Sequence, residues 1–358
     1  MFTIDVLIPG CGKYGPFSDR RSAILPRTVL GLLVALLTSS LIPAERVWWE
    51  ANDVFFDSQL WSSGRQIQSR ASVWGEEVSF EAGKTYYGRE RYIEYQSGKL
   101  PIIIVAPHGG RIKPNELPDR EQGVFAVDVN TQELARAVAQ QLQQDTGQPV
   151  HLVICRLHRK KIDCNRELEE GAGNHPLTKQ SWNEYHRYIE TGCKAVVTSH
   201  QRGLLIDLHG HGHALQHIEL GYLHSRKELL VDDAGLNRVE LMTSGSLKAL
   251  MALPTRVTYA ELLRGPTSMG GLLQKEGLAA TPSPQIPQPP LPYFSGLYTL
   301  QRHARDAGPM CGVQMETHWK ELRDTEQSRD AFACKFVPVL RAFLLHHLKL
   351  ELPTDPKK

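Results

Sequence analysis

The central segment of this chain reads Leu204-Leu205-Ile206-Asp207-Leu208-His209-Gly210-His211-Gly212-His213. The apolar run predicts a buried strand, and open α/β sheets place their ligands at the carboxyl ends of such strands. Side chains alternate along a strand, so Asp207, His209, His211 and His213 share one side if the strand continues that far. Imidazole is the commonest metal ligand in proteins, and a nearby carboxylate can fix its tautomer. The alternative is a glycine-rich surface loop that contains many histidines.

A second predicted strand ends in the same way. Pro107-His108-Gly109-Gly110 follows the apolar run Ile102-Ile103-Ile104-Val105-Ala106, and Glu116 comes eight residues after His108. Glycine allows backbone and metal to approach closely because it has no Cβ. Two such strand ends with one carboxylate predict a His–Glu–His set that leaves a position for water, the open arrangement of catalytic zinc.

Length and composition indicate an ordinary soluble globular protein. The 358 residues suffice for one large domain or two small ones, and 22% of them are charged. The net charge is +2, and the basic residues form no run interleaved with aromatic residues, so we expect no nucleic-acid partner. The six cysteines contain no CxxC pair, which argues against a cysteine zinc site or a redox motif.

The amino terminus carries a pattern typical of a targeting signal. Residues 29–42 are mostly apolar and follow Arg20, Arg21 and Arg27. A run of this length suits a signal peptide better than a membrane span, which needs about 20 residues. We therefore expect residues 1–44 to be a leader, either cleaved or retained as a signal anchor, that directs the protein to the secretory pathway. Membrane contact is expected only through this segment.

The rest of the chain predicts a short extension over residues 45–97 and a catalytic domain over residues 98–352. From residue 100 onward strands and helices alternate, which predicts a three-layer α/β/α fold around a mostly parallel mixed sheet. Two capping-box patterns, Asn130 with Glu133 and Ser181 with Glu184, predict helix starts. Strands are expected at residues 150–155, 204–208, 218–223 and 311–316, and helices at residues 130–146 and 330–350.

A cationic segment follows one of these strands and reads Arg156-Leu157-His158-Arg159-Lys160-Lys161-Ile162-Asp163-Cys164-Asn165-Arg166. An Arg fork binds a carboxylate through two parallel hydrogen bonds, so this segment could hold an acidic substrate. Asp163 could keep one arginine in place. The alternative is a solvated loop.

Three further residues complete the candidate site. Glu316 ends the last predicted strand and has the chemistry of a general base, although alone it would be an ordinary surface carboxylate. Tyr293 lies in a region rich in Pro, Gly and Ser, residues 264–298, whose end could form a pocket wall. His186 shares a predicted helix with Trp182 and Tyr185, and its alternative role is that of a core histidine.

With these residues assembled, the chain resembles the N-formylglutamate amidohydrolase family. The matching pieces are Pro107-His108-Gly109-Gly110, Ile162-Asp163-Cys164-Asn165-Arg166, Trp182 through His186, Asp207-Leu208-His209-Gly210-His211-Gly212, and Gln314-Met315-Glu316. The Asp163 to Arg166 and Asp207 to His209 pieces are also similar to aspartoacylase and other zinc carboxypeptidase-like amidohydrolases. The match covers roughly residues 101–343, with the leader outside it.

The resemblance implies a carboxypeptidase/phosphorylase-hydrolase-like fold with one catalytic zinc. It implies that His108, Glu116 and His209 bind Zn²⁺, and that Glu316 is the base. Zinc carboxypeptidases place His and Glu three residues apart, whereas eight separate them here, so Asp128 is the reserve ligand. His211 or His213 could replace His209, although the Asp207-Leu208-His209 match favours His209.

The resemblance also implies a substrate site. Arg159 would polarise the scissile carbonyl, and Asn165 with Arg166 would bind the substrate carboxylate, with Asp163, His186 and Tyr293 around them. The expected reaction is hydrolysis of an amide in an N-acyl, formyl-like acidic amino acid, or in a related γ-glutamyl or short peptide substrate. The alternatives are a carboxypeptidase-like metallopeptidase and a non-catalytic secreted module that binds a metal or ligand.

Overall fold

The computed structural model describes residues 71–73, 76–78, 80–254 and 257–355. The predicted leader, residues 1–44, lies outside the described residues, so the signal peptide or anchor stays a prediction. The five cysteines of the described part are all free thiols, and Cys155 and Cys311 are buried in the core.

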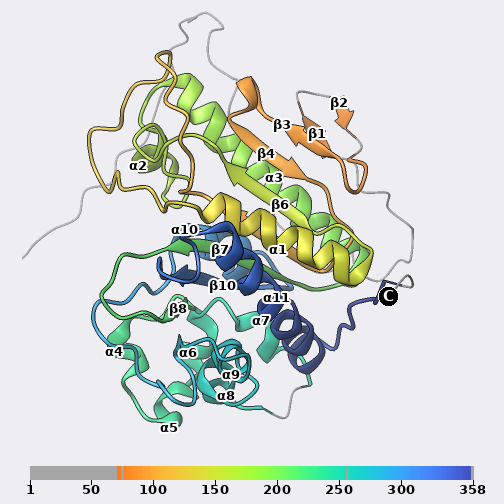
Figure 1. The fold of residues 1–358 in the computed structure, drawn as a ribbon, viewed down its shortest axis with the longest axis vertical. Helices are drawn as coiled ribbons and strands as arrows, with labels where there is room; N and C mark the ends of the chain where they lie inside the picture. Colours follow the sequence, from red (N-terminus) through yellow and green to blue (C-terminus); the bar gives the residue numbers. More distant parts are fainter. Residues whose placement is uncertain (1–70, 74–75, 79, 255–256, 356–358) are drawn as a thin grey trace, which may run out of the picture. The chain divides into compact units, whose positions relative to one another are not determined.

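A mixed sheet of eight strands forms the centre of the described chain (Figure 1). In chain order the strands are β3 (Thr85–Tyr87), β4 (Ile93–Gln96), β5 (Ile102–Ala106), β6 (His151–Cys155), β7 (Gly203–Gly210), β8 (Ile218–Gly221), β9 (Ala280–Thr281) and β10 (Met310–Thr317). Their spatial order is β3-β4-β6-β5-β7-β10-β8-β9. The predicted extension therefore contributes β3 and β4 to one edge of the sheet, and β1 (Ala71–Val73) and β2 (Glu76–Val78) form a separate antiparallel pair.

The four strands that carry the predicted site run in the same direction. β5 pairs in parallel with β6 and β7, and β7 pairs in parallel with β10. Within the eight-stranded sheet, antiparallel pairing is confined to β3 with β4, β4 with β6, and β8 with β10. The carboxyl ends of β5, β6, β7 and β10 therefore meet at one edge, the usual ligand edge of an open α/β sheet.

Helices cover both faces of the sheet (Figure 1), which confirms the predicted three-layer α/β fold. Strand β5 shows why, because its side chains alternate between two cores. Ile102 and Ile104 pack in the core that includes α1 (Thr131–Thr146) and α11 (Glu326–Phe343). Ile103 and Val105 pack in the core that includes α3 (Pro176–His200). A strand buried on both faces reads as a continuous apolar run, as the sequence does here.

The helical stretch Glu326–Leu348 is the one described helix long and apolar enough to cross a membrane by length and composition. Of its most apolar window, 56% is buried inside the protein. Its buried phenylalanines, Phe332, Phe336 and Phe343, belong to the core shared with α1. Packing therefore accounts for its apolar character.

Short helices lie in the connection between β8 and β10, for which the sequence analysis predicted no helix or strand. They are α4 (Arg226–Leu229), α5 (Asp233–Leu236), α6 (Val239–Ser244), α7 (Lys248–Met251), α8 (Tyr259–Arg264) and α9 (Met269–Lys275). The reading of residues 264–298 as one long loop is thus wrong at its start, because α9 and β9 lie within it. Ser268 caps α9 through a hydrogen bond from the backbone N–H of Gly271.

Both predicted capping boxes are wrong, although both helices exist. Asn130 precedes α1 in a left-handed conformation, φ 64°, and its side-chain amide donates to the carbonyl of Arg323 instead of capping. Helix α3 begins at Pro176, ahead of Ser181, whose hydroxyl donates to the carbonyl of Leu177 inside the helix. Proline is favoured in the first turn because it lacks the N–H that would be unpaired there.

A candidate metal centre at the carboxyl edge of the sheet

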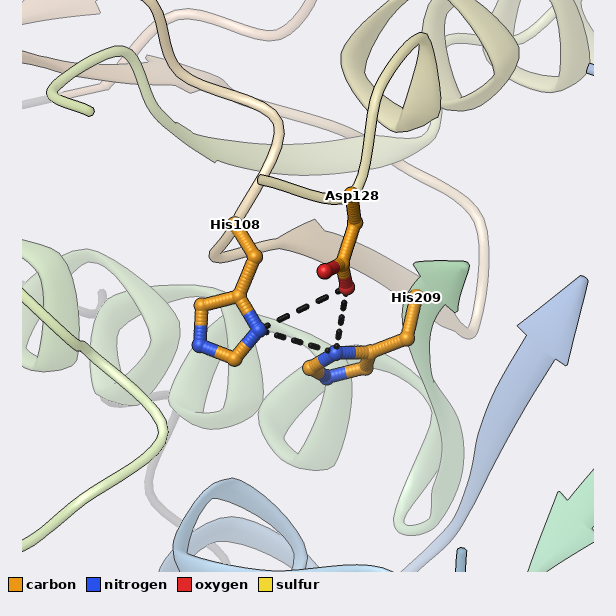
Figure 2. Close-up of side chains that lie close together, drawn as sticks. All are labelled: His108, Asp128 and His209. Atoms are coloured by element: carbon orange, nitrogen blue, oxygen red, sulfur yellow. Dashed lines mark hydrogen bonds and ion pairs between the residues drawn. The ribbon is translucent and has the colours of Figure 1, made fainter. Parts of the chain in front are cut away.

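Three buried side chains converge on one point at this edge (Figure 2). His108 follows β5, Asp128 precedes α1, and His209 lies near the end of β7. Nδ1 of His108 is 3.1 Å from Nδ1 of His209, and Oδ2 of Asp128 is 3.5 Å from the first nitrogen and 3.2 Å from the second. Ligand atoms around a tetrahedral zinc with bonds of about 2.0–2.2 Å are roughly 3.3–3.6 Å apart. The three atoms therefore fit a small divalent cation.

The other nitrogen of each imidazole faces a second carboxylate. Nε2 of His108 is hydrogen-bonded to Oδ1 of Asp163 at 2.7 Å. Nε2 of His209 lies 3.0 Å from Oδ1 of the fully buried Asp207, two residues earlier on the same side of β7. A carboxylate on Nε2 favours the tautomer with its proton there, which leaves the lone pair of Nδ1 for a metal. Both histidines are therefore oriented as metal ligands.

Electrostatics in the centre favour bound positive charge. Burial raises the pKa of Asp128, but hydrogen bonds and charges from His108 and His209 outweigh burial and hold it well below its usual range. Burial likewise lowers the pKa of His209, but the charge of Asp207 and the hydrogen bond with Asp128 outweigh burial and hold it well above its usual range. The carboxylates around the ligand atoms thus favour positive charge at this place, which a divalent cation would supply.

Glu316 adjoins the three ligands from the neighbouring strand. It pairs with His209 in the register of β10 and β7, and its Oε1 lies 3.9 Å from Nδ1 of His209. Burial, opposed by the charge of His209 and reinforced by those of Asp128 and Glu219, raises the pKa of Glu316 to about 8. A carboxylate beside the ligands, with a pKa near neutrality, has the properties of a general base.

Arg159 provides a buried cation at the same place. Its Nε donates to Oδ2 of Asp163 at 2.9 Å, and its Nη1 lies 3.7 Å from Oδ1 of Asp128. Asp163 therefore links two parts of the site, because its other oxygen holds His108. A guanidinium fixed in this way can donate to an oxygen that gains negative charge near the centre.

Glu116 does not lie with the two histidines, contrary to the sequence-based ligand set. Its carboxylate is bound by Nη1 of Arg89 at 2.6 Å and by the hydroxyl of Tyr92 at 2.7 Å, and its side chain is 40% exposed. These contacts hold the pKa of Glu116 at about 2. Asp128, the reserve ligand, occupies the third position instead.

Four of the five predicted substrate-binding residues have side chains engaged by other groups in the interior, and their contact with substrate stays a prediction. Asp163 is fully buried between His108 and Arg159. His186 is buried on α3, with Nδ1 2.8 Å from Nε2 of His303, as its alternative core role required. The Tyr293 hydroxyl donates to the carbonyl of Leu220 in β8.

Asn165 is the fourth, and it supports His209 from within the core. Its Nδ2 lies 3.3 Å from Nε2 of His209 and donates to Oε1 of Gln314 at 3.2 Å, while its Oδ1 accepts the backbone N–H of Thr299. Both ends of its amide are in use, and Asn165 has no exposed surface.

Arg166 is a predicted substrate-binding residue that reaches solvent. Its side chain is 22% exposed, and its Nε donates to Oε1 of Glu170 at 2.9 Å. A substrate carboxylate would have to replace Glu170 at this guanidinium. The pair is consistent with an Arg site for an acidic group that an internal carboxylate occupies.

Sequence reasoning missed Gln314. Its Nε2 donates to Oε1 of Glu316 at 2.9 Å and its Oε1 accepts from Nδ2 of Asn165 at 3.2 Å, so hydrogen bonds join Glu316, Gln314 and Asn165. The available signal was the period of two in β10, which places Gln314 and Glu316 on one side.

Two motif glycines make room for protein atoms and not for a metal. A Cβ on Gly110 would lie 2.0 Å from the carbonyl oxygen of Leu157, and a Cβ on Gly210 would lie 2.3 Å from the guanidinium of Arg323. Arg323 donates to the carbonyls of Val129, His211 and Thr317, so it joins the segments that carry Asp128, His209 and Glu316. The glycines therefore let the segments of the site pack together.

Among known proteins, no family model and no curated protein matches this chain. Similar solved structures include a gene product of Agrobacterium tumefaciens, with 14% identity over 71% of this chain and 93% of that one and a TM-score of 0.41. They also include N-formylglutamate amidohydrolase from Ralstonia eutropha, with 15% identity over 72% and 97% of the two chains and a TM-score of 0.39. Succinylglutamate desuccinylase from Chromobacterium violaceum has 11% identity over 75% and 71%, with a TM-score of 0.32.

Proposed function

We propose that this protein is a zinc-dependent amidohydrolase that acts on a small N-acyl acidic amino acid. The observation that carries the proposal is the convergence of two imidazole Nδ1 atoms and one carboxylate oxygen within 3.5 Å, with a second carboxylate at Nε2 of each imidazole. Three ligands of this kind make up an open catalytic zinc site, whereas structural zinc sites use four.

The residues around the centre fit hydrolysis of an amide. When bound by His108, Asp128 and His209, zinc supplies Lewis acidity, which polarises a carbonyl and lowers the pKa of water to about 7. Glu316 is close enough to take the proton of the attacking water and pass it to the leaving amine. Arg159 can donate to the acyl oxygen as it gains negative charge, because Asp163 fixes its Nε.

Selectivity for an acidic substrate is assigned to Arg166. Its guanidinium already binds one carboxylate, that of Glu170, in a partly exposed position. An incoming carboxylate of the substrate would compete for the same planar fork. N-formyl-, N-acetyl- and N-succinylglutamate are therefore suitable first substrates, with N-acyl alanines as uncharged comparisons and glutamate-terminated dipeptides as test peptides.

The experiment is a metal-dependence assay on the full chain. The protein is stripped with a chelator, reloaded with zinc and assayed for amine release from that panel. We expect hydrolysis of N-acylglutamates by the zinc form, little activity in the stripped form, and restoration when zinc is added. Equal activity with and without the metal would contradict zinc dependence. Hydrolysis of the dipeptides alone would indicate a peptidase, and inactivity of zinc-loaded protein on the whole panel would favour a binding module.

A further inference from the structure

A second group of metal-ligating side chains lies on the other side of β10 from His209. It consists of His211 and His213 from the loop after β7, His217 from the same loop, and Glu219 on β8, and we refer to it as the His211 cluster. Glu219 pairs with Glu316 in the register of β8 and β10. Neither the proposed reaction nor the candidate metal centre uses these four residues.

The donor atoms of the His211 cluster are close together. Nδ1 of His213 lies 2.6 Å from Oε1 of Glu219, and possible ligand atoms of His211, His213 and Glu219 all lie within 4.8 Å of one another. Nε2 of His211 bonds to the carbonyl of His217, at 2.8 Å, and must donate its proton there. Its other nitrogen, Nδ1, therefore has the lone pair, which now accepts the backbone N–H of His213.

His217 provides a second, independent observation. Its side chain is buried, with 5% of the residue exposed, and its Nε2 has no hydrogen-bond partner among the described residues. That nitrogen lies 3.9 Å from Oε1 of Glu219. Leaving a buried polar atom unpaired is unfavourable, so an atom in this position points to an unseen partner.

The buried carboxylate of Glu219 also favours a bound cation in the His211 cluster. Glu219 is fully buried, and its described contacts are the imidazoles of His213 and His217 and the backbone N–H of Phe294. No lysine or arginine of the described chain forms an ion pair with it. Glu316, another buried carboxylate, stands beside it on β10. Two neighbouring buried carboxylates are costly unless they take up protons or positive charge is bound nearby.

We propose that His211, His213 and Glu219 form a second site for a first-row divalent cation, with zinc as the best match and His217 able to supply a further nitrogen. Imidazole with one carboxylate is a donor set that suits zinc. The ion would fasten the loop between β7 and β8 to β8 itself. It would also fix the imidazole of His213, which stacks on Phe294 with ring centroids 4.9 Å apart.

Metal counting on the full chain tests this proposal. Each protein is stripped, saturated with zinc, passed over a desalting column and analysed by mass spectrometry of the metal. We expect about two zinc ions per wild-type chain, and about one in His213→Ala and in Glu219→Gln. His346→Ala makes the same change at an exposed histidine outside the cluster and should retain both ions. His108→Ala should also retain one ion, so failure of the catalytic centre is distinguishable from failure of the second site.

Wild-type protein provides a measurement that does not depend on variants. Amide hydrogen exchange of residues 211–217 should slow on addition of the second equivalent of zinc, because the ion would tie this loop to β8. A single zinc ion in the saturated wild type that is lost in His108→Ala would overturn the proposal. So would two ions that persist in both His213→Ala and Glu219→Gln, or exchange that is unchanged by the second equivalent.

Discussion

Glu316 stands opposite His209 in the parallel register of β10 and β7, and its Oε1 lies 3.9 Å from Nδ1 of His209. The backbone hydrogen bonds of the two strands therefore set the distance between the proposed base and a proposed ligand. Gln314, on the same side of β10, donates to that carboxylate and fixes its orientation. This arrangement separates two roles, because Glu316 is near the metal centre while His108, Asp128 and His209 supply the converging atoms.

The first prediction concerns Glu316→Gln, which keeps the shape of the side chain and removes its basicity. We expect kcat for N-acylglutamate hydrolysis to fall by roughly 10²–10⁴, as is usual when general acid–base catalysis is lost. Zinc content and KM should stay close to wild type. Glu116→Gln is the matched control, because this carboxylate lies apart from the centre. Wild-type turnover in Glu316→Gln would mean that Glu316 takes no part in catalysis. Loss of zinc in this variant would mean that Glu316 is a metal ligand.

The second prediction concerns the third ligand. Asp128→Asn removes the negative charge that faces both imidazoles, so we expect zinc affinity at the His108–His209 centre to fall by more than about 100-fold, which exceeds the loss typical of a residue behind a ligand. In Glu116→Gln the affinity should be unchanged, since that substitution removes a partly exposed ion pair with Arg89. Competition with a chromophoric chelator measures both. The reverse order of affinities would restore the assignment of Glu116.

The residues of the candidate site that lie on a strand or directly after one could be predicted from the sequence. Apolar runs locate β5, β7 and β10, and parallel strands end at a common edge, so His108, His209 and Glu316 had to come close together. Asp128, which lies in a loop, was only the reserve ligand, because no pattern in the sequence places it beside the histidines. Asp128 is brought to His108 by a hydrogen bond from its own backbone N–H to the carbonyl of His108, at 3.2 Å, and sequence spacing does not reveal such a path.

Glu116 also shows that sequence spacing does not predict which carboxylate lies beside His108. It is nearer to His108 in sequence, but its partners Arg89 and Tyr92 come from the segment that flanks the edge strand β4. The family resemblance placed Asn165 and Asp163 at the substrate. Their complete burial, which depends on packing around α3 and β10, places them behind the imidazoles instead. The residue types indicated the chemistry of the site, whereas the direction in which each side chain points could be known only from the folded structure.

The third prediction concerns the pairing of Arg166 with Glu170. Arg166→Lys keeps the charge and loses the planar fork, so KM for N-acylglutamates should rise about tenfold or more, as for loss of a charge-assisted hydrogen bond of about 1.5–3 kcal/mol. Glu170→Gln should lower KM, because the internal competitor for the guanidinium is weakened. Uncharged N-acyl alanines provide the control and should respond to neither change. KM values that are equal for all three proteins would remove Arg166 from the substrate site.

The last prediction concerns acid stability and His151, which is buried in β6 away from the metal centre. Its Nδ1 lies 3.0 Å from the hydroxyl of Tyr95 and accepts the backbone N–H of Gly98. Burial, with a smaller contribution from the charge of His200, lowers the pKa of His151 to about 4. In the unfolded chain a histidine titrates near 6.5.

The sign of the change in the free energy of unfolding depends on whether the folded or the unfolded chain takes up the proton at the higher pH. Above pH 6.5 the imidazole is neutral in both states and has no effect on stability. As the pH falls from 6.5 toward 4, the unfolded chain is protonated while folded His151 stays neutral, so the free energy of unfolding decreases. By pH 5 this one group should remove about 2 kcal/mol.

Urea unfolding at pH 7.5 and pH 5, with chelator present so that metal release does not contribute, measures the effect. Wild type should lose more stability between the two pH values than His151→Gln, by about 2 kcal/mol, because glutamine does not titrate. The variant should be less stable than wild type at pH 7.5, since the packing around Tyr95 is disturbed. His346→Gln, an exposed position, should show the wild-type pH dependence. Equal losses in wild type and His151→Gln would mean that His151 titrates alike in the folded and unfolded chains.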